Sequence, residues 1–347
     1  MVEIIPTFSI NDVENYKKIL NEYSKLDIDK IRINMTRHEP EFYVKEISVI
    51  KEIYRNITNG KKLRILLDIP FPGTKSRIEF DGESHFITLN EREELFISRN
   101  KDDMDIRRKI IFVENSADLF TAKINDKVFI DDGRVKLIVV SNDGRMMKLS
   151  SLNSGKAIYK KSINREGAIY FQEERVDYIN NLMLAIKEIS PESLALSFIE
   201  NDKQLEQFKC LLKKNEVNDQ ILLIPKLETP TSSENISHII SSCKTVMIGR
   251  GDLGLTGNIC NLPFYQQNIL DACRKSKIDV IVATDILNSV TTTSIPNRAE
   301  LIDVFSLVQN NVSRFVTSGP VGLGEGLEEF CKVVREIYDL YHSNTTT

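Results

Sequence analysis

A lysine and two carboxylates stand at the ends of two apolar runs, and their types and spacing suit chemistry on a charged substrate. Lys226 and Glu228 close the run 221–228, and Asp252 follows the run that begins at Val246. Residues two apart on a strand point the same way, so Lys226 and Glu228 would project together. Mg²⁺ prefers a few carboxylate oxygens, and a nearby lysine can neutralise charge on a transferring group. The trio predicts a divalent-cation site beside a phosphate or a carboxylated substrate, with plain salt bridges at strand ends as the alternative.

Other polar residues follow neighbouring apolar runs. Arg32 and Asn34 alternate so that they share a face, and an arginine there can hold a phosphate with two hydrogen bonds. Gly251 begins a segment whose free amide groups can bind a carboxylate or a phosphate if a helix starts there. The remaining candidates, in chain order, are Asp68, Lys75, Arg77 and Thr284. Each of these residues by itself is equally consistent with a turn or a cap.

Eight short apolar runs alternate with segments of helical spacing, and together they predict the fold. The runs are residues 2–9, 30–35, 63–69, 193–198, 221–227, 245–250, 279–285 and 314–319. Strands that alternate with helices pair in parallel, and eight such units close a barrel. We therefore expect an α/β fold, a (β/α)8 TIM barrel, with the polar residues named above at the carboxyl ends of its strands.

More than a hundred residues separate the third run from the fourth, which indicates an inserted domain. Short β-type runs alternate there with turn signals such as Asp131-Asp-Gly133 and Asn142-Asp-Gly144. We expect a small β-barrel-like lid domain of residues 81–163, inserted after strand 3 of a catalytic barrel formed by residues 1–80 and 164–347. Active sites of such barrels lie at the carboxyl ends of the strands, so an insert at this point can act as a lid.

Composition narrows the class of protein. The 347 residues carry 46 Lys and Arg against 50 Asp and Glu, and a net charge of −4 argues against a nucleic-acid partner. The chain has no apolar stretch of eighteen residues and no secretory signal at its start, so we expect a cytoplasmic protein without a membrane partner. Five cysteines without C-x-x-C spacing indicate neither a disulfide framework nor a zinc site, and we expect reduced, mostly buried thiols.

Seven ordered motifs, spread over nearly the whole chain, resemble those of the pyruvate kinase family. The matching segments are Ile31-Arg-Ile-Asn-Met-Thr36, Leu67-Asp68 with Gly73-Thr-Lys-Ser-Arg77, Ile130-Asp-Asp-Gly133, Pro225-Lys-Leu-Glu228, Gly249-Arg-Gly-Asp-Leu-Gly254, Val282-Ala-Thr-Asp-Ile-Leu287 and Pro296-Asn-Arg-Ala-Glu300. The resemblance implies the glycolytic transfer of a phosphoryl group between phosphoenolpyruvate and ADP, which gives pyruvate and ATP and depends on Mg²⁺ or Mn²⁺. Such transfer is mostly positioning plus charge neutralisation.

The resemblance also assigns roles to residues around the substrate. Glu228 and Asp252 would hold the divalent ion, and Lys226 would stabilise the transferring phosphoryl group, which Arg32 would also contact. Gly251 and Asp252 would bind the substrate together with Thr284, and the hydroxyl of Thr284 would lie on the proton-transfer side of the enolate.

Further positions match the nucleotide and monovalent-cation sites of the family. Arg77 and Lys161 would approach the nucleotide phosphates when the lid closes. Asn34, Thr36 and Asp68 match the ligands of a monovalent cation. Family members that require potassium have a glutamate where Lys75 stands, and a lysine there supplies the positive charge internally, so we expect no requirement for K⁺.

Several departures from the family pattern bear on activity. Arg37 stands where the family has a histidine, Asp285 replaces a glutamine beside Thr284, and Pro320 replaces a glutamate. The sequence stops after the barrel, which leads us to expect a monomer or homodimer without control by sugar phosphates. Three alternatives stay open at this point: a phosphotransferase of specialised metabolism with a different acceptor or donor, a metal-dependent aldolase or lyase acting on a pyruvate enolate, and a non-catalytic regulatory paralogue.

Overall fold

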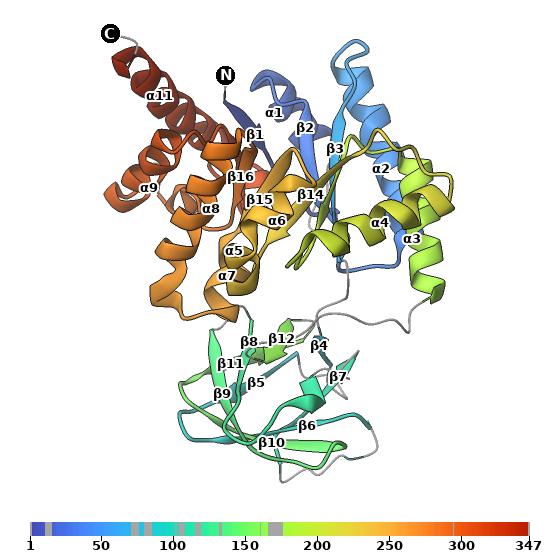
Figure 1. Cartoon of the computed structure of the whole chain (residues 1–347), viewed down its shortest axis with the longest axis vertical. Coiled ribbons are helices and arrows are strands. Elements are labelled where there is room, and N and C mark those ends of the chain that lie inside the picture. Colours follow the sequence, from blue (N-terminus) through green and yellow to red (C-terminus); the bar gives the residue numbers. More distant parts are fainter. Residues whose placement is uncertain are drawn as a thin grey trace. The chain divides into compact units, whose positions relative to one another are not determined.

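The chain divides into two compact units, each with its own sheet (Figure 1). Each unit also has its own apolar core. The first comprises residues 1–72, 172–253 and 262–347, and the second comprises residues 73–171 and 254–261. The computed structural model describes residues 2–10, 16–70, 76–79, 85–100, 103, 108–114, 119–131, 134–159, 161–165, 176–293 and 295–345. Lys75, Asp132 and Gly133 lie outside the described residues, and of Arg77 only the backbone is described. The domain boundaries expected from the sequence stay a prediction.

Eight parallel strands form the sheet of the first unit, in the order β1-β17-β16-β15-β14-β13-β3-β2. They are β1 (Glu3–Ile5), β2 (Lys30–Asn34), β3 (Arg64–Ile69), β13 (Ser193–Leu196), β14 (Leu222–Leu227), β15 (Thr245–Gly249), β16 (Asp279–Ala283) and β17 (Arg314–Val316). A parallel bridge between Thr7 and Arg32 joins the segment after β1 to β2, so the sheet returns on itself. The predicted α/β barrel is confirmed, and each predicted run contains one of its strands.

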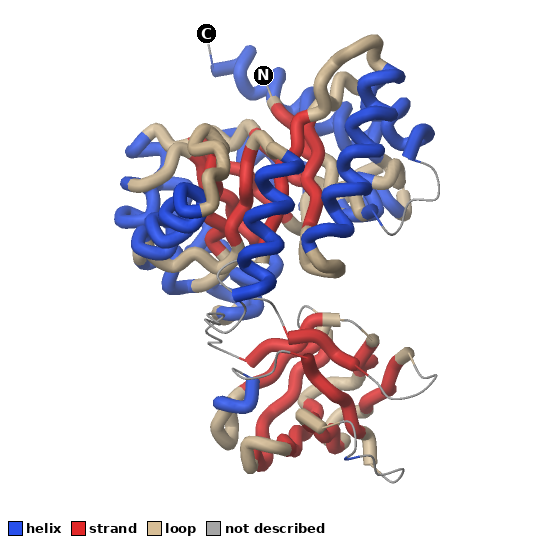
Figure 2. The backbone as a smooth tube through the Cα atoms, turned by 90° about the vertical axis from the view of Figure 1, so that its right-hand side faces the viewer, coloured by secondary structure: helices blue, strands red, loops and turns tan. Residues whose placement is uncertain are grey.

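Helices surround these strands, as Figure 2 shows with helices in blue and strands in red. They are α1 (Tyr16–Lys25), α2 (Pro40–Ile57), α3 (Val176–Ile189), α4 (Asp202–Lys214), α5 (Pro230–Glu234), α6 (Ile236–Ser241), α7 (Arg250–Thr256), α8 (Leu262–Ser276), α9 (Arg298–Gln309), α10 (Gly319–Gly322) and α11 (Leu327–Thr345). The strands are buried on both faces, which is why they read as continuous apolar runs. Their inward side chains form a small core of Ile5, Leu66, Ala195, Ile224, Met247, Ile281, Ala283 and Val316, and a larger core fills the layer between strands and helices.

The second unit contains a closed barrel of mostly antiparallel strands in the order β10-β6-β7-β4-β12-β8-β9, with a separate pair β11-β5. Its strands are β4 (Ser76–Glu79), β5 (Phe86–Leu89), β6 (Glu94–Ser98), β7 (Ile110–Glu114), β8 (Lys127–Ile130), β9 (Val135–Asn142), β10 (Met146–Ser151), β11 (Gly155–Ile158) and β12 (Ser162–Arg165). The predicted Asn-Asp-Gly turn connects β9 to β10, and Gly144 there has a φ of +84°, which a glycine adopts without strain. The prediction of a small β-barrel inserted after the third barrel strand is confirmed.

The cysteines differ from expectation. All five are free thiols, but only Cys273 and Cys331 are buried, whereas Cys210 and Cys260 are exposed. The expectation of mostly buried thiols was therefore wrong. Cys210 lies on α4, whose buried positions are Leu205, Phe208 and Leu212, and the helical repeat places position 210 off that stripe.

Among the residues that the structure describes, no helix combines the length and the apolar composition needed to cross a membrane.

Candidate active site

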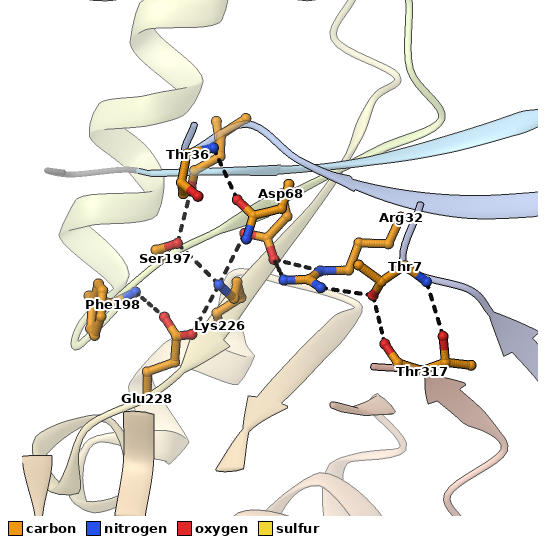
Figure 3. Close-up of polar contacts among 11 residues, drawn as sticks. Thr7, Arg32, Thr36, Asp68, Ser197, Phe198, Lys226, Glu228 and Thr317 are labelled. Carbon is orange, nitrogen blue, oxygen red and sulfur yellow. Dashed lines mark hydrogen bonds and ion pairs between the residues drawn. The ribbon is translucent and has the colours of Figure 1, made fainter. Parts of the chain in front are cut away.

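Lys226, near the end of β14, lies at the centre of a buried polar cluster (Figure 3). Its side-chain ammonium lies 3.0 Å from Asp68 Oδ1 and 3.0 Å from Glu228 Oε1, and it donates to Ser197 Oγ at 3.2 Å. These partners come from β3, from the end of β14 and from the segment after β13, which are neighbours in the barrel sheet. Lys226 is only 8% exposed, so these three oxygens replace much of the water that an ammonium normally binds.

Asp68, at the end of β3, accepts hydrogen bonds from two cations through one carboxylate. Oδ1 accepts a hydrogen bond from the Lys226 ammonium. Oδ2 accepts one from Nε of Arg32 at 2.8 Å and lies 2.6 Å from Nη2 of the same guanidinium. Nη1 of Arg32 donates to Thr7 Oγ1 at 2.9 Å, which fixes the far edge of the guanidinium. Asp68 is completely buried, and it holds its two partners, Lys226 and Arg32, at the same end of the barrel.

The charges of this cluster stabilise one another. Burial by itself raises the pKa of Asp68, but the positive charges of Lys226 and Arg32 outweigh it and lower the pKa below its usual value. Burial lowers the pKa of Lys226, but Asp68 and Glu228 outweigh it and raise the pKa above its usual value. Asp68 therefore stays negative and Lys226 stays positive near neutral pH.

Glu228 is held in one orientation from both sides. Its Oε2 accepts a hydrogen bond from the backbone amide of Phe198 at 3.0 Å, and Oε1 faces Lys226. A Cβ at Gly249, the last residue of β15, would lie 2.8 Å from both Cγ and Oε1 of Glu228. A glycine at this position leaves the space that the carboxylate occupies.

The donor set of Glu228 and Asp252 fits a magnesium ion. Glu228 follows β14, and Asp252 lies in the first turn of α7, directly after the neighbouring strand β15. Within the described part of the chain, no group of three or more His, Cys, Asp or Glu residues could enclose a metal. Mg²⁺ is typically held by one or two carboxylates and completes its coordination with water and substrate oxygens, so two carboxylates at adjacent strand ends are sufficient.

Thr284 follows β16 in a strained backbone conformation. Its φ is +78°, and Asp285 and Leu287 also have positive φ values, of 55° and 47°. A β-branched residue rarely adopts this region, and the strain costs roughly 1–3 kcal/mol per residue. A Cβ at Gly251 would lie 3.0 Å from Cγ2 of Thr284, so the Thr284 side chain lies directly against the start of α7. The structure thus brings together Gly251 and Thr284, two of the predicted substrate-binding residues.

Asn34 and Thr36, the predicted monovalent-cation positions, lie beside Asp68. Asn34 pairs with Asp68 in the register of β2 and β3, and its Oδ1 accepts a hydrogen bond from the amide of Thr36 at 3.1 Å. This contact forms a tight turn directly after β2. The fourth predicted position, Lys75, is not among the described residues. A role for the group in cation binding stays a prediction.

Lys161, predicted to contact nucleotide phosphates, forms an ion pair within the inserted unit. Its ammonium lies 2.8 Å from Oδ1 of Asp131, and Arg134 lies 3.4 Å from Oδ2 of the same carboxylate. Asp131 is buried, whereas the Lys161 side chain is half-exposed. The Asp131 carboxylate therefore joins Arg134 to Lys161. A role of these residues in lid closure stays a prediction. Arg77 lies in β4, where its backbone pairs with Ser162.

The side chains at the three departures from the family pattern lie at the surface or in an ordinary helix turn. Arg37 is exposed, and its amide donates to Tyr43 Oη at 3.2 Å. Asp285 is also exposed, and its carboxylate accepts a hydrogen bond from Asn288 at 2.7 Å. Pro320 stands in the first turn of α10, where a proline is favourable because the amide there needs no partner.

Sequence reasoning missed several residues that shape the site. Ser197 and Phe198 directly follow β13, so the rule that polar groups at strand ends are informative could have found Ser197. Thr7 also follows a strand, β1, but its partner was not predictable, because its hydroxyl donates to Thr317 O at 2.7 Å across more than three hundred residues of sequence. Arg250 was read as part of a motif without a role of its own, although its guanidinium contacts the loop after β16 and the helix α9.

Comparison with known proteins agrees with this geometry. A family model described as the barrel domain of pyruvate kinase matches residues 2–325. The pyruvate kinase of Thermococcus litoralis is 24% identical over 346 residues, which cover 94% of this chain and 68% of that protein. The pyruvate kinase of Staphylococcus saprophyticus is 25% identical over 335 residues, which cover 95% of this chain and 55% of that protein.

Shorter segments match at higher identity. Pyruvate kinase isozyme A of Ricinus communis, a chloroplastic protein, is 31% identical over 144 residues, which cover 42% of this chain and 25% of that protein. The chain thus spans only part of the length of the relatives it matches. Because the family model covers almost the whole barrel and its insert, the chain belongs to the pyruvate kinase family.

Proposed function

We propose that the protein transfers a phosphoryl group between phosphoenolpyruvate and ADP, in the presence of Mg²⁺, with pyruvate and ATP as products. The observation that carries this proposal is the buried Lys226 ammonium, fixed between Asp68, Glu228 and Ser197 at the carboxyl ends of the barrel strands. Arg32 approaches the same Asp68 carboxylate, so two cations are available to one anionic substrate.

Phosphoryl transfer needs positive charge that is already in place. Negative charge spreads over the oxygens of the transferring group, and catalysis consists mostly of positioning and charge stabilisation. Lys226 and Arg32 are both fixed by Asp68, and Thr7 fixes the other edge of Arg32. Groups held in this way need little rearrangement when the charge develops, which is the condition for strong electrostatic stabilisation.

Glu228 and Asp252 would hold the divalent ion. Bound Mg²⁺ or Mn²⁺ would supply positive charge against the phosphoryl and enolate oxygens of the substrate. Gly251 and Thr284 would line the substrate, with the Thr284 hydroxyl on the side from which the enolate receives its proton. Arg77 and Lys161 would contact the nucleotide phosphates. We expect turnover without K⁺, because Lys75 would supply the positive charge.

The test is the formation of pyruvate from phosphoenolpyruvate and ADP with Mg²⁺ in a potassium-free buffer. The wild type is compared with Lys226→Met and with Lys30→Met. Lys30 is a matched control because it is also buried, and it lies 3.2 Å from Glu192, but it stands at the amino end of β2.

We expect a wild-type rate of about 1–100 per second, and a loss of at least about 100-fold for Lys226→Met. Lys30→Met should retain its turnover once it is folded. A rate raised many-fold by KCl relative to a Tris salt would contradict the expectation about K⁺. If the protein shows no turnover but phosphoenolpyruvate still raises its melting temperature, ADP is not the acceptor. That result would indicate a different phosphoryl acceptor or donor. Absence of both turnover and stabilisation would overturn the proposal entirely.

A further inference from the structure

Arg250, the first residue of α7, holds the loop that follows β16. Its Nε donates to the carbonyl oxygen of Thr284 at 2.9 Å, and its Nη2 donates to the carbonyl oxygen of Asp285 at 2.8 Å. Both carbonyls belong to residues with positive φ. One edge of a planar guanidinium thus spans two consecutive peptide groups in a conformation that non-glycine residues rarely adopt.

The same guanidinium is anchored on α9. Its Nη1 donates to Oδ1 of Asp303 at 2.9 Å and to Oδ2 at 2.7 Å. Arg250 is 9% exposed, so these contacts are largely shielded from water. Because the guanidinium is rigid, the position of Asp303 determines where Nε and Nη2 point.

A second contact from α9 holds the other end of the loop. Glu300, three residues before Asp303, accepts hydrogen bonds from the amide of Ser289 at 3.0 Å and from its hydroxyl. The amide of Glu300 in turn donates to Asn297 Oδ1 at 3.0 Å in the capping box that begins the helix. The segment from Thr284 to Ser289 is therefore tied to the first turns of α9 at both ends.

We propose that Arg250 is a positioning residue, which keeps Thr284 in its left-handed conformation so that the Thr284 side chain lies against Gly251. The consequence for turnover rests on the proposed function, in which Thr284 serves the proton-transfer step. The restraint on the backbone does not depend on that function. A lysine could not replace Arg250, because one ammonium cannot span two carbonyls and a carboxylate with the same geometry.

The first measurement is kinetic and uses Arg250→Met, Arg250→Lys and Asp303→Asn. Arg335→Met is the control, since Arg335 on α11 also donates to a backbone carbonyl, that of Leu26, at 2.6 Å. We expect kcat to fall about 10- to 100-fold in all three Arg250 and Asp303 variants, as misplacement of a reacting group does. The KM for phosphoenolpyruvate should rise by a smaller factor than kcat falls, because Thr284 and Gly251 line the substrate in the proposed function, whereas none of the contacts found for Arg250 involves Lys226 or Arg32. The solvent deuterium isotope effect on kcat should rise, which a general loss of stability would not cause.

The second measurement is amide hydrogen exchange of residues 284–293, and it needs no activity. The amides of Val290 and Thr292 are hydrogen-bonded within this region, and the amide of Ser289 donates to Glu300 on α9, so all three report its order. They should exchange several-fold faster in Arg250→Met than in the wild type, and at the wild-type rate in Arg335→Met. If the wild type makes no pyruvate, the proposed function fails while exchange still decides the role of Arg250.

The inference is overturned if folded Arg250→Met keeps the wild-type exchange in this region, or if Arg250→Lys restores kcat. If Arg250→Met does not fold, Asp303→Asn takes its place, because it retains the arginine but removes its carboxylate anchor. The same two measurements on Asp303→Asn then test whether Arg250 positions the loop.

Discussion

Asp68 connects both cations of the site, so its removal should be costly at the scale of a single residue. Replacement by Asn would leave the buried Lys226 and the partly buried Arg32 close together and without a full counter-charge. Breaking a buried ion pair in this way typically costs about 3–5 kcal/mol. We expect a loss of this size in the free energy of unfolding of Asp68→Asn, measured by urea denaturation followed by circular dichroism.

The matched control is Asp271→Asn. Asp271 also pairs with an arginine, Arg274, at 2.6 Å, but both side chains are partly exposed. Surface pairs contribute roughly 0–1 kcal/mol, so the control should unfold almost like the wild type. Equal losses of unfolding free energy in the two variants would mean that the stability of the buried cluster does not depend on the Asp68 charge.

The lowered pKa of Asp68 predicts how this difference changes with pH. A carboxyl whose pKa is lower in the folded state than in the unfolded state stabilises the fold fully above its unfolded pKa of about 3.9. That contribution is lost as the pH falls through the lower, folded pKa. The gap in unfolding free energy between the wild type and Asp68→Asn should be constant between about pH 5 and pH 8 and should narrow below about pH 4. A gap that widens on acidification would contradict the assignment.

The polar residues at the ends of strands were accessible from the sequence because a strand repeats every two residues. This repeat placed Lys226 and Glu228 on one side, and their charged groups lie 3.0 Å apart. Thr7 and the pair of Arg250 with Asp303 follow no such repeat. Their contacts join segments that only the closed barrel and its helices bring together, so they were not predictable from local spacing.

At the scale of the element, the loop after β16 is the clearest case of strain retained at a site. Thr284→Gly should remove the cost of a positive φ in a β-branched residue, because glycine adopts this region freely. We expect the variant to be as stable as the wild type or more stable by up to about 1 kcal/mol, while turnover falls. Thermal unfolding and the pyruvate assay would measure the two effects.

The control for this prediction is Thr292→Gly in the same segment. Thr292 has a φ of −115°, which any residue adopts, so glycine there relieves no strain; it adds freedom to the unfolded chain and removes an exposed hydrogen bond from the Thr292 hydroxyl to the Ser289 carbonyl oxygen. We expect this variant to lose about 0.5–1 kcal/mol. If Thr284→Gly were destabilised to the same extent, strain at Thr284 would not be a feature of the loop.

The end of β15 requires a glycine for a different reason. In Gly249→Ala the new methyl group would lie 2.8 Å from Glu228, so the carboxylate must leave its position between Lys226 and the Phe198 amide. We expect weaker Mg²⁺ binding, seen as a higher Mg²⁺ concentration for the half-maximal rate. We also expect a loss of about 1–3 kcal/mol in the free energy of unfolding. Gly319→Ala is the control, since the nearest atom to its methyl group would be Ser9 Oγ at an ordinary 3.4 Å. An unchanged half-maximal Mg²⁺ concentration in Gly249→Ala would show that Mg²⁺ binding does not require the Glu228 carboxylate at this position.

The strands of the barrel were predictable as elements because each is buried on both faces and reads as an apolar run. The inserted barrel was predictable through its turns, of which Asn142-Asp-Gly144 is the described example. The pairing order β10-β6-β7-β4-β12-β8-β9 was not, because it joins strands far apart in the chain and includes one parallel pair, β6 with β7. Turn chemistry determines which strands form hairpins, but non-local pairing depends on the core that closes the barrel.

At the scale of the whole molecule, the chain has separate apolar cores in its two units. Leu137 in β9 and Leu66 in β3 are both completely buried, the first in the core of the insert and the second inside the eight-stranded barrel. A Leu→Ala change at either position should cost about 2–5 kcal/mol through lost contacts and a new cavity. Because multidomain chains often do not unfold in one step, each cost should appear mainly in the unit that carries the change.

Amide hydrogen exchange of the two variants tests this separation. In Leu137→Ala, the amides of β8, β9 and β10 should exchange faster, while those of β3, β14 and β15 should keep the wild-type rate. In Leu66→Ala the pattern should reverse, so each variant serves as the control for the other. Local stability follows cooperative units, and two closed sheets with separate cores are expected to form two such units. Equal acceleration in both sets of strands, in both variants, would instead show that the insert and the barrel unfold as a single cooperative unit despite their separate cores.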